Sequence, residues 1–173
     1  MNQNTELSDT LALSGHLTIT SKDVMGKETV LLNKHNLIVN LARIFILSSL
    51  YTSGNVTRAI STLRVGTGGT IDPDGKFVKP ADINQTALNN EVDVSGVPYE
   101  VVLTAVPDLT NSKVTFLADI GYGDLSGIQL TEAGLYCGSY SDSVPPILFS
   151  VKNHPGINKS SAFSLHYEWV IRI

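Results

Sequence analysis

Residues 36–54 differ from the rest of the chain, because they carry the only long helical pattern in a sequence of strand and turn patterns. Leu37, Leu41 and Ile44 recur at helical spacing, and their apolar neighbours leave only a narrow polar stripe. A helix that is apolar on most sides needs cover from more than one direction. We therefore predict a helix over residues 37–50 that is buried in the core.

The ends and the length of this helix also follow from the sequence. Asn36 is placed to cap the first turn, and Gly54 supplies a stop signal. At about 21 Å the helix would be shorter than the roughly 30 Å hydrocarbon core of a bilayer, and Arg43 lies near its middle. The pattern thus favours a core helix over a membrane span. A contact with another subunit is the remaining alternative.

Most other apolar residues alternate with polar ones, which is typical of half-buried strands. The longest alternation closes the chain and places these residues on one face: Phe163, Leu165, Tyr167, Trp169, Ile171 and Ile173. Several such strands with a single helix predict a mainly β protein. The expected fold is an antiparallel β-sandwich, jelly-roll-like, with one buried α-helix.

Five local predictions complete this picture. Val30 and Leu32 should both face inward on a strand that precedes the helix, and residues 99–105 should form one strand of a hairpin with residues 114–120. A short helical turn is expected around residues 86–90. Residues 147–151 should form a short strand, and the segment from His154 to Ser161 should be a surface loop.

Length and composition indicate the number of domains, the kinds of partner and the compartment in which the protein folds. The 173 residues suit one domain over residues 10–173, with residues 1–9 as a polar, flexible or partner-bound arm. A net charge of −4 and 16% charged residues give no basic footprint for nucleic acid. Cys137 is the only cysteine, and the first residues lack the features of a signal peptide, so we expect folding in a cytoplasm.

Each stretch that resembles a ligand site has a simpler interpretation. Gly66, Gly68 and Gly69 lack the Gly-Lys-Ser/Thr and the following helix of a phosphate loop. Asp72 and Asp74 lie in an Asp-Pro-Asp-Gly turn sequence that lacks the closing Glu of an EF-hand.

The individual candidate residues also have simpler interpretations than a ligand site. The four histidines, His16, His35, His154 and His166, lack partners at metal-ligand spacing. Glu132 is expected to accept hydrogen bonds from a loop backbone, and Gly134 to mark a bulge or a close backbone approach. We therefore predict no catalytic, cofactor-binding or metal-binding residues.

Five segments occur in an order that resembles phage structural proteins. They are the apolar helix, Leu-Arg-Val-Gly-Thr-Gly-Gly at 63–69, Thr-Ala-Leu-Asn-Asn-Glu-Val at 86–92, the hairpin with Val-Thr-Phe at 114–116, and Gln-Leu-Thr-Glu-Ala-Gly-Leu-Tyr at 129–136. This order of segments is similar to that of the N-terminal attachment domain of phage tail-collar fibre proteins, and the similarity covers roughly residues 35–140. Small accessory proteins of phage heads, necks and baseplates share it.

The resemblance implies a subunit of the virion. A tail fibre would continue into a long shaft, whereas this chain closes with a strand at Ile173, so a free-standing decoration protein or a fibre, neck or baseplate adaptor is expected. Its partners would be other virion proteins and further copies of itself, without nucleic acid or membrane. It would be made in the host cytoplasm.

Three function classes remain for the chain. The first is a non-enzymatic phage virion structural protein that acts in assembly and stabilisation. The second is a carbohydrate- or receptor-binding β-sandwich, in which exposed aromatic rings would form a stacking surface. Its candidate residues are Tyr99, Tyr122, Tyr136, Tyr140 and Trp169. The third is an enzyme, for which the sequence offers no nucleophile elbow, zinc helix or paired-cysteine motif.

Overall fold

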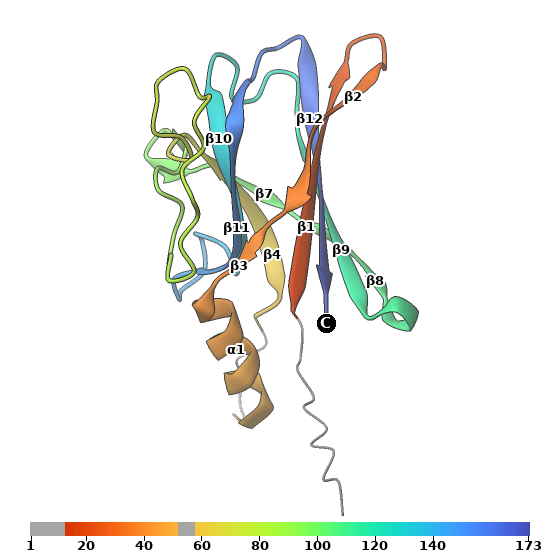
Figure 1. The fold of residues 1–173 in the computed structure, drawn as a ribbon, viewed down its shortest axis with the longest axis vertical. Helices are drawn as coiled ribbons and strands as arrows, with labels where there is room; N and C mark the ends of the chain where they lie inside the picture. Colours follow the sequence, from red (N-terminus) through yellow and green to blue (C-terminus); the bar gives the residue numbers. More distant parts are fainter. Residues whose placement is uncertain (1–12, 52–57) are drawn as a thin grey trace, which may run out of the picture.

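The computed structural model describes residues 13–51 and 58–173, and it is mainly β, with antiparallel sheets and one helix. Two five-stranded sheets face each other, as Figure 1 shows. This confirms the predicted fold class. The predicted arm at residues 1–9 and the helix stop at Gly54 lie outside the described residues.

The first sheet has the strand order β2-β1-β12-β9-β8. Its strands are β1 (Ser14–Asp23), β2 (Glu28–His35), β8 (Thr104–Asp108), β9 (Lys113–Ile120) and β12 (Phe163–Arg172), and the 3₁₀ turn η1 (Leu109–Asn111) joins β8 to β9. In β12, Leu165, Tyr167 and Trp169 are buried, as their alternation predicts. Ile173 is mostly exposed instead, because the strand ends at Arg172.

The second sheet has the strand order β3-β11-β10-β4-β7. Its strands are β3 (Leu37–Ile38), β4 (Ile60–Gly66), β7 (Glu100–Val102), β10 (Gln129–Cys137) and β11 (Ile147–Asn158). A separate two-stranded ribbon joins β5 (Asp93–Val94) to β6 (Val97–Pro98). The hydrophobic core lies between the two large sheets, because both contribute to one cluster of buried side chains.

Helix α1 (Asn40–Tyr51) begins later than predicted. Leu37 and Ile38 pair with Val151 and Ser150 on β11, so backbone hydrogen bonds to another strand take these two residues out of the helix. The Asn36 side chain donates to the Ser150 hydroxyl rather than capping the helix.

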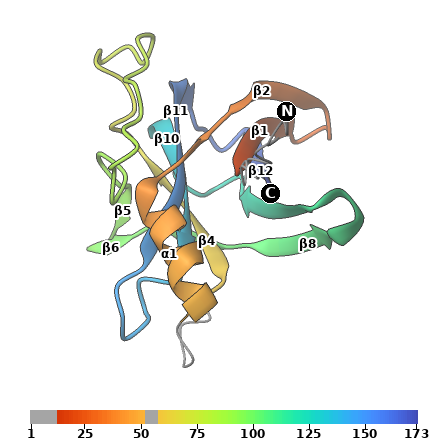
Figure 2. The same ribbon diagram turned by 60° about the horizontal axis from the view of Figure 1, so that its bottom comes forward.

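The helix is also less buried than predicted. It sits at one end of the second sheet and packs against β11 (Figure 2). Ala42 is fully buried on this side, and Phe45 is half-buried. Ile44 and Leu47 are each 60% exposed. No helix among the described residues has the length and apolar character that a bilayer crossing requires.

Two further differences come from strand register. A bulge in β2 sets Ile19 opposite Leu32 but Thr20 opposite Val30, so Leu32 is buried while Val30 faces out. The strand predicted over residues 99–105 divides at Leu103, since β7 pairs with β4 in one sheet and β8 pairs with β9 in the other.

Most of the segment predicted as a loop, His154 to Ser161, belongs to the second half of β11, which continues to Asn158. It can remain a strand because of a wide bulge, in which His154, Pro155 and Gly156 lie opposite the single residue Thr131 of β10. The predicted helical turn at residues 86–90 is absent, and these residues have irregular backbone.

Candidate functional site

A buried carboxylate, Glu132 on β10, holds the long loop of residues 67–92 on the second sheet. Its Oε1 accepts hydrogen bonds from the backbone amides of Gly68 at 3.0 Å and Asn90 at 2.8 Å. Its Oε2 accepts from the backbone amide of Asn89 at 2.9 Å and from the Asn89 side chain at 2.8 Å. These four bonds fill the acceptor capacity of a carboxylate. The predicted role of Glu132 as an acceptor for a loop backbone is confirmed.

The glycines beside this carboxylate are required by close packing. A Cβ on Gly68 would lie 2.6 Å from the Asn89 Cβ and 2.9 Å from the Glu132 Oε1 atom. A Cβ on Gly69 would overlap the backbone carbonyl of Thr131. A Cβ on Gly134 of β10 would lie 2.9 Å from a side-chain atom of Leu148 and 3.0 Å from one of Leu88, so side chains approach this glycine, and not the bulge or backbone that was predicted. The glycine-rich segment therefore serves the contact between loop and strand.

The same loop is anchored a second time by an ionic cluster, which sequence reasoning missed. Arg64 on β4 is buried, and its guanidinium lies 3.1 Å from the Glu91 carboxylate and 3.3 Å from that of Glu100. The guanidinium also stacks over the Tyr136 ring at 4.5 Å. The carboxylate partners of Arg64 lie 27 and 36 residues further along the chain, so the local sequence does not identify them.

Tyr136 completes the cluster. Its hydroxyl donates to Glu91 at 2.6 Å and accepts from the backbone amide of Leu88 at 3.0 Å. Burial, reinforced by the neighbouring Glu91 carboxylate, raises the pKa of Tyr136. Because Arg64 and Tyr136 both bind Glu91, and Tyr136 also binds the Leu88 amide, the cluster acts as a structural clamp on the loop.

The Asp-Pro-Asp-Gly sequence forms the predicted turn, with the Gly75 amide donating to the Asp72 carbonyl at 3.2 Å. The two oxygens of the Asp72 side chain accept from the backbone amides of Lys76 and Phe77. The first of these bonds is the largest cause of a lowered Asp72 pKa. Asp74 pairs with Lys76 at 3.4 Å. The Asp72 carboxylate is therefore engaged by its own loop.

The four histidines do not converge on one site, although two of them are neighbours. His16 and His35 lie on neighbouring strands with ring centres 5.1 Å apart, and Nδ1 of His166 donates to the Asp119 carboxylate at 2.8 Å. His154 is buried in β11. Among residues 13–51 and 58–173, no three His, Cys, Asp or Glu side chains come together in a group that could hold a metal ion.

The five candidate aromatic residues do not share one surface. Tyr136 and Trp169 are buried, and Tyr99 is half-buried with its hydroxyl donating to Asp124. Burial, helped by the Asp124 carboxylate, raises the pKa of Tyr99 to about 12. Tyr122 and Tyr140 remain exposed.

Large apolar side chains are exposed on α1, which Figure 2 turns forward, and on two other elements. Ile44 and Leu47 lie on α1, Val102 on β7 is 79% exposed, and Leu109 in η1 is 86% exposed. We call Ile44 and Leu47, which are three residues apart and therefore neighbours on the helix surface, the helix-end set. Exposed apolar side chains of this size favour contact with another protein surface.

No protein-family profile matches the chain, and neither a curated protein nor a solved structure matches it.

Proposed function

We propose that this protein is a non-enzymatic structural subunit of a phage virion that acts in particle assembly and stabilisation. Its place would be that of a tail-fibre, baseplate or neck adaptor or of a capsid decoration subunit. The observation that carries the proposal is the helix-end set, since a half-buried helix with Ile44 and Leu47 each 60% exposed suits a contact with a neighbouring subunit.

The phage assignment itself rests on the ordered sequence segments. Three of them meet in space, which supports treating them as one structural plan. Gly68 from the segment 63–69 and Asn89 from the segment 86–92 both donate to Glu132 from the segment 129–136. A loop tied down in this way presents a fixed surface to a partner, with little ordering entropy to lose on binding.

Particles purified from infected cells provide the test. We expect the chain to copurify with particles, and the double substitution Ile44→Ser/Leu47→Ser to remove it from them while circular dichroism of the isolated protein is unchanged. The matched control is Val24→Ser, because Val24 is 72% exposed but lies in the turn between β1 and β2, at the opposite end of the sandwich from α1 (Figure 1). Absence of the wild-type chain from particles, or equal incorporation of the double variant, would overturn the proposal.

The alternative function is a carbohydrate- or receptor-binding module. Tyr122 and Tyr140 are the exposed aromatic residues of the five candidates and would have to carry the stacking. Because two of the other candidates are buried, we rank this function second. A glycan array with wild-type protein and with Tyr140→Ala distinguishes the two functions.

A further inference from the structure

A hollow of about 500 Å³ lies on the outer face of the first sheet, over β2, β1 and β12, which are neighbours in that sheet (Figure 1). The β12 side chains that line it alternate with the buried Tyr167 and Trp169, because successive residues of a strand face opposite ways. The size of the hollow is within the range of small-molecule sites. The lining residues that matter for binding are His16, Asn33, His35, Glu168, Val170 and Arg172.

The two ends of this hollow carry opposite charges. Glu168 and Arg172 are four residues apart on β12, so their Cα atoms are separated by about 13 Å. Both residues are exposed, so a molecule in the solvent can reach them. Val170 lies between them and opposite His16 of β1, which in turn lies opposite His35 of β2. The middle of the hollow is therefore formed by one apolar side chain and two imidazole rings.

The charges at the two ends are not paired within the described part of the protein. Neighbouring charges on the same face form ion pairs at 2.8–3.6 Å: Asp119 with His166, Asp108 with Lys113, and Glu28 with Lys22. In contrast, the side chains of Glu168 and Arg172 have no ion-pair or hydrogen-bond partner among residues 13–51 and 58–173. Both charged groups are therefore available to a ligand.

The middle of the hollow is held in place by hydrogen bonds. Nε2 of His16 donates to the side-chain oxygen of Asn33, and Nδ1 of His35 donates to the Gly15 carbonyl at 3.4 Å. Strand β12 is itself paired on both sides, with β1 and with β9. A site on such a strand loses little freedom when a ligand binds, which favours affinity.

We propose that this hollow binds a small zwitterion, an organic molecule with a carboxylate and an ammonium group at opposite ends of an apolar chain. The carboxylate pairs with the Arg172 guanidinium, whose planar fork matches it with two parallel hydrogen bonds. The ammonium group pairs with the Glu168 carboxylate, and the apolar chain lies over Val170. An ω-amino acid about as long as a dipeptide spans roughly 7 Å, which leaves about 3 Å at each end for the two ion pairs.

The probe is 6-aminohexanoate, and hexanoate and hexylammonium are its matched controls, because each keeps the chain and one of the two charges. We would titrate each into methyl-labelled protein at low salt and follow the methyl signals of Val170. Only 6-aminohexanoate engages both ends, so it should bind at least about fivefold more tightly than either control. The shorter zwitterion 3-aminopropanoate cannot span the two ends and should bind as weakly as the controls.

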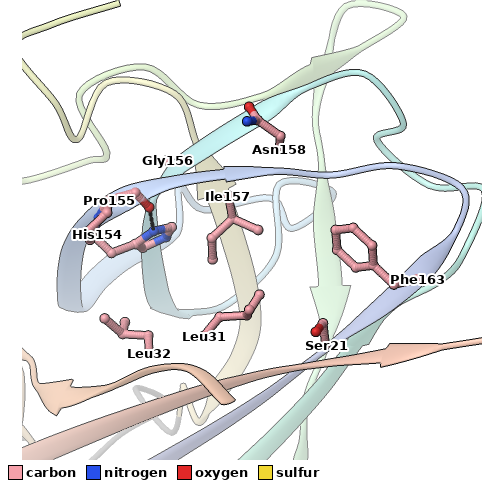
Figure 3. A pocket seen from close by; sticks show the side chains of 9 residues that line it. All are labelled: Ser21, Leu31, Leu32, His154, Pro155, Gly156, Ile157, Asn158 and Phe163. Carbon is pink, nitrogen blue, oxygen red and sulfur yellow. Dashed lines mark hydrogen bonds between the residues drawn. The ribbon is translucent and has the colours of Figure 1, made fainter. Parts of the chain in front are cut away.

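A cavity elsewhere in the protein provides the reference for non-specific binding. It has a volume of about 330 Å³ and lies beside His154, where the second half of β11 passes β2 (Figure 3). Leu31 and Ile157 line it, and none of its nine lining residues is Asp, Glu, Lys or Arg. The methyl signals of Leu31 and Ile157 should therefore show no saturable shift with 6-aminohexanoate.

Two substitutions on the exposed face complete the test. Arg172→Gln should lower the affinity for 6-aminohexanoate to that of hexylammonium for wild type, and Glu168→Gln should lower it to that of hexanoate. Lys113→Gln, on the same face but outside the hollow, should leave the affinity unchanged.

Four results would overturn the proposal: no saturable shift at Val170, equal affinities for 6-aminohexanoate and its singly charged controls, an unchanged affinity in Arg172→Gln or Glu168→Gln, or equal shifts at Leu31 and Ile157.

Discussion

Glu132 and Gly68 are 64 residues apart in the chain, yet the carboxylate of the first accepts the backbone amide of the second at 3.0 Å inside the protein. The contact is possible because Gly68 has no side chain to hold the two apart. The Glu132 carboxylate on β10 has no solvent exposure, so amides of the loop take the place of water as its hydrogen-bond donors. A buried carboxylate is tolerated only with such partners.

Replacing Glu132 should therefore release the loop. In Glu132→Gln one acceptor oxygen becomes an NH₂ group that faces amide donors, and we expect the free energy of unfolding to fall by about 2–4 kcal/mol. Chemical denaturation measures this change. Glu168→Gln, on an exposed side chain of β12, should change stability by less than about 0.5 kcal/mol. Equal effects of the two substitutions would contradict the role of Glu132.

The glycine requirement can be tested by a pair of alanine substitutions. Gly69→Ala should destabilise the protein by about 2 kcal/mol or more, because its Cβ would overlap the Thr131 carbonyl and either loop or strand must move. Gly123→Ala meets nothing within 4 Å and should be nearly neutral. Thermal melts of both variants give the comparison, and a Gly69→Ala melting temperature equal to the wild type would refute the steric argument.

His154 should make stability depend on pH. Burial lowers its pKa to about 4 in the folded protein against 6.5 ordinarily, so between these values the unfolded chain binds a proton that the folded protein does not. The free energy of unfolding should then fall as pH is lowered from 6.5 to 4, by about 3 kcal/mol from this residue. His154→Phe removes the titration, so denaturation across this window should show a shallower dependence. Parallel pH profiles of stability for wild type and His154→Phe would contradict this role of His154.

Cys137 should be unreactive while the protein is folded. The thiol is buried, and burial raises its pKa to about 12, so little thiolate forms at pH 8. Labelling with a disulfide reagent should be slow in buffer and fast in denaturant, as a spectrophotometric time course records. Rapid labelling of the folded protein would show that β10 opens readily.

Calcium should not change the melting temperature. The Asp72 carboxylate already accepts two backbone amides, which a calcium ion would have to displace. Calorimetry of wild type and Asp72→Ala/Asp74→Ala, with and without millimolar calcium, is the measurement. A site with a hundredfold excess of ligand over its Kd would gain about 2.7 kcal/mol. A calcium-dependent rise in wild type that vanishes in the double variant would establish a site.

Local pattern was sufficient where one short segment determines its own structure. The alternation around Leu165, Tyr167 and Trp169 predicts which side chains are buried, because successive residues of a strand point to opposite faces. The turn at Asp72 follows from residues within hydrogen-bonding reach along the chain. The acceptor role of Glu132 was also predicted, although its partners were not named.

Tertiary contacts decided the rest. Leu37 and Ile38 have a helical pattern, but they pair with strand β11 instead. How much of α1 is exposed depends on which of its sides the neighbouring elements cover, and Ile44 and Leu47 lie on an uncovered side. The cavity beside His154 was equally invisible, since a bulge has no fixed sequence signature and Pro155 and Gly156 favour a loop locally. These features depend on hydrogen bonds and packing between segments far apart in the chain, which a reading of neighbouring residues does not contain.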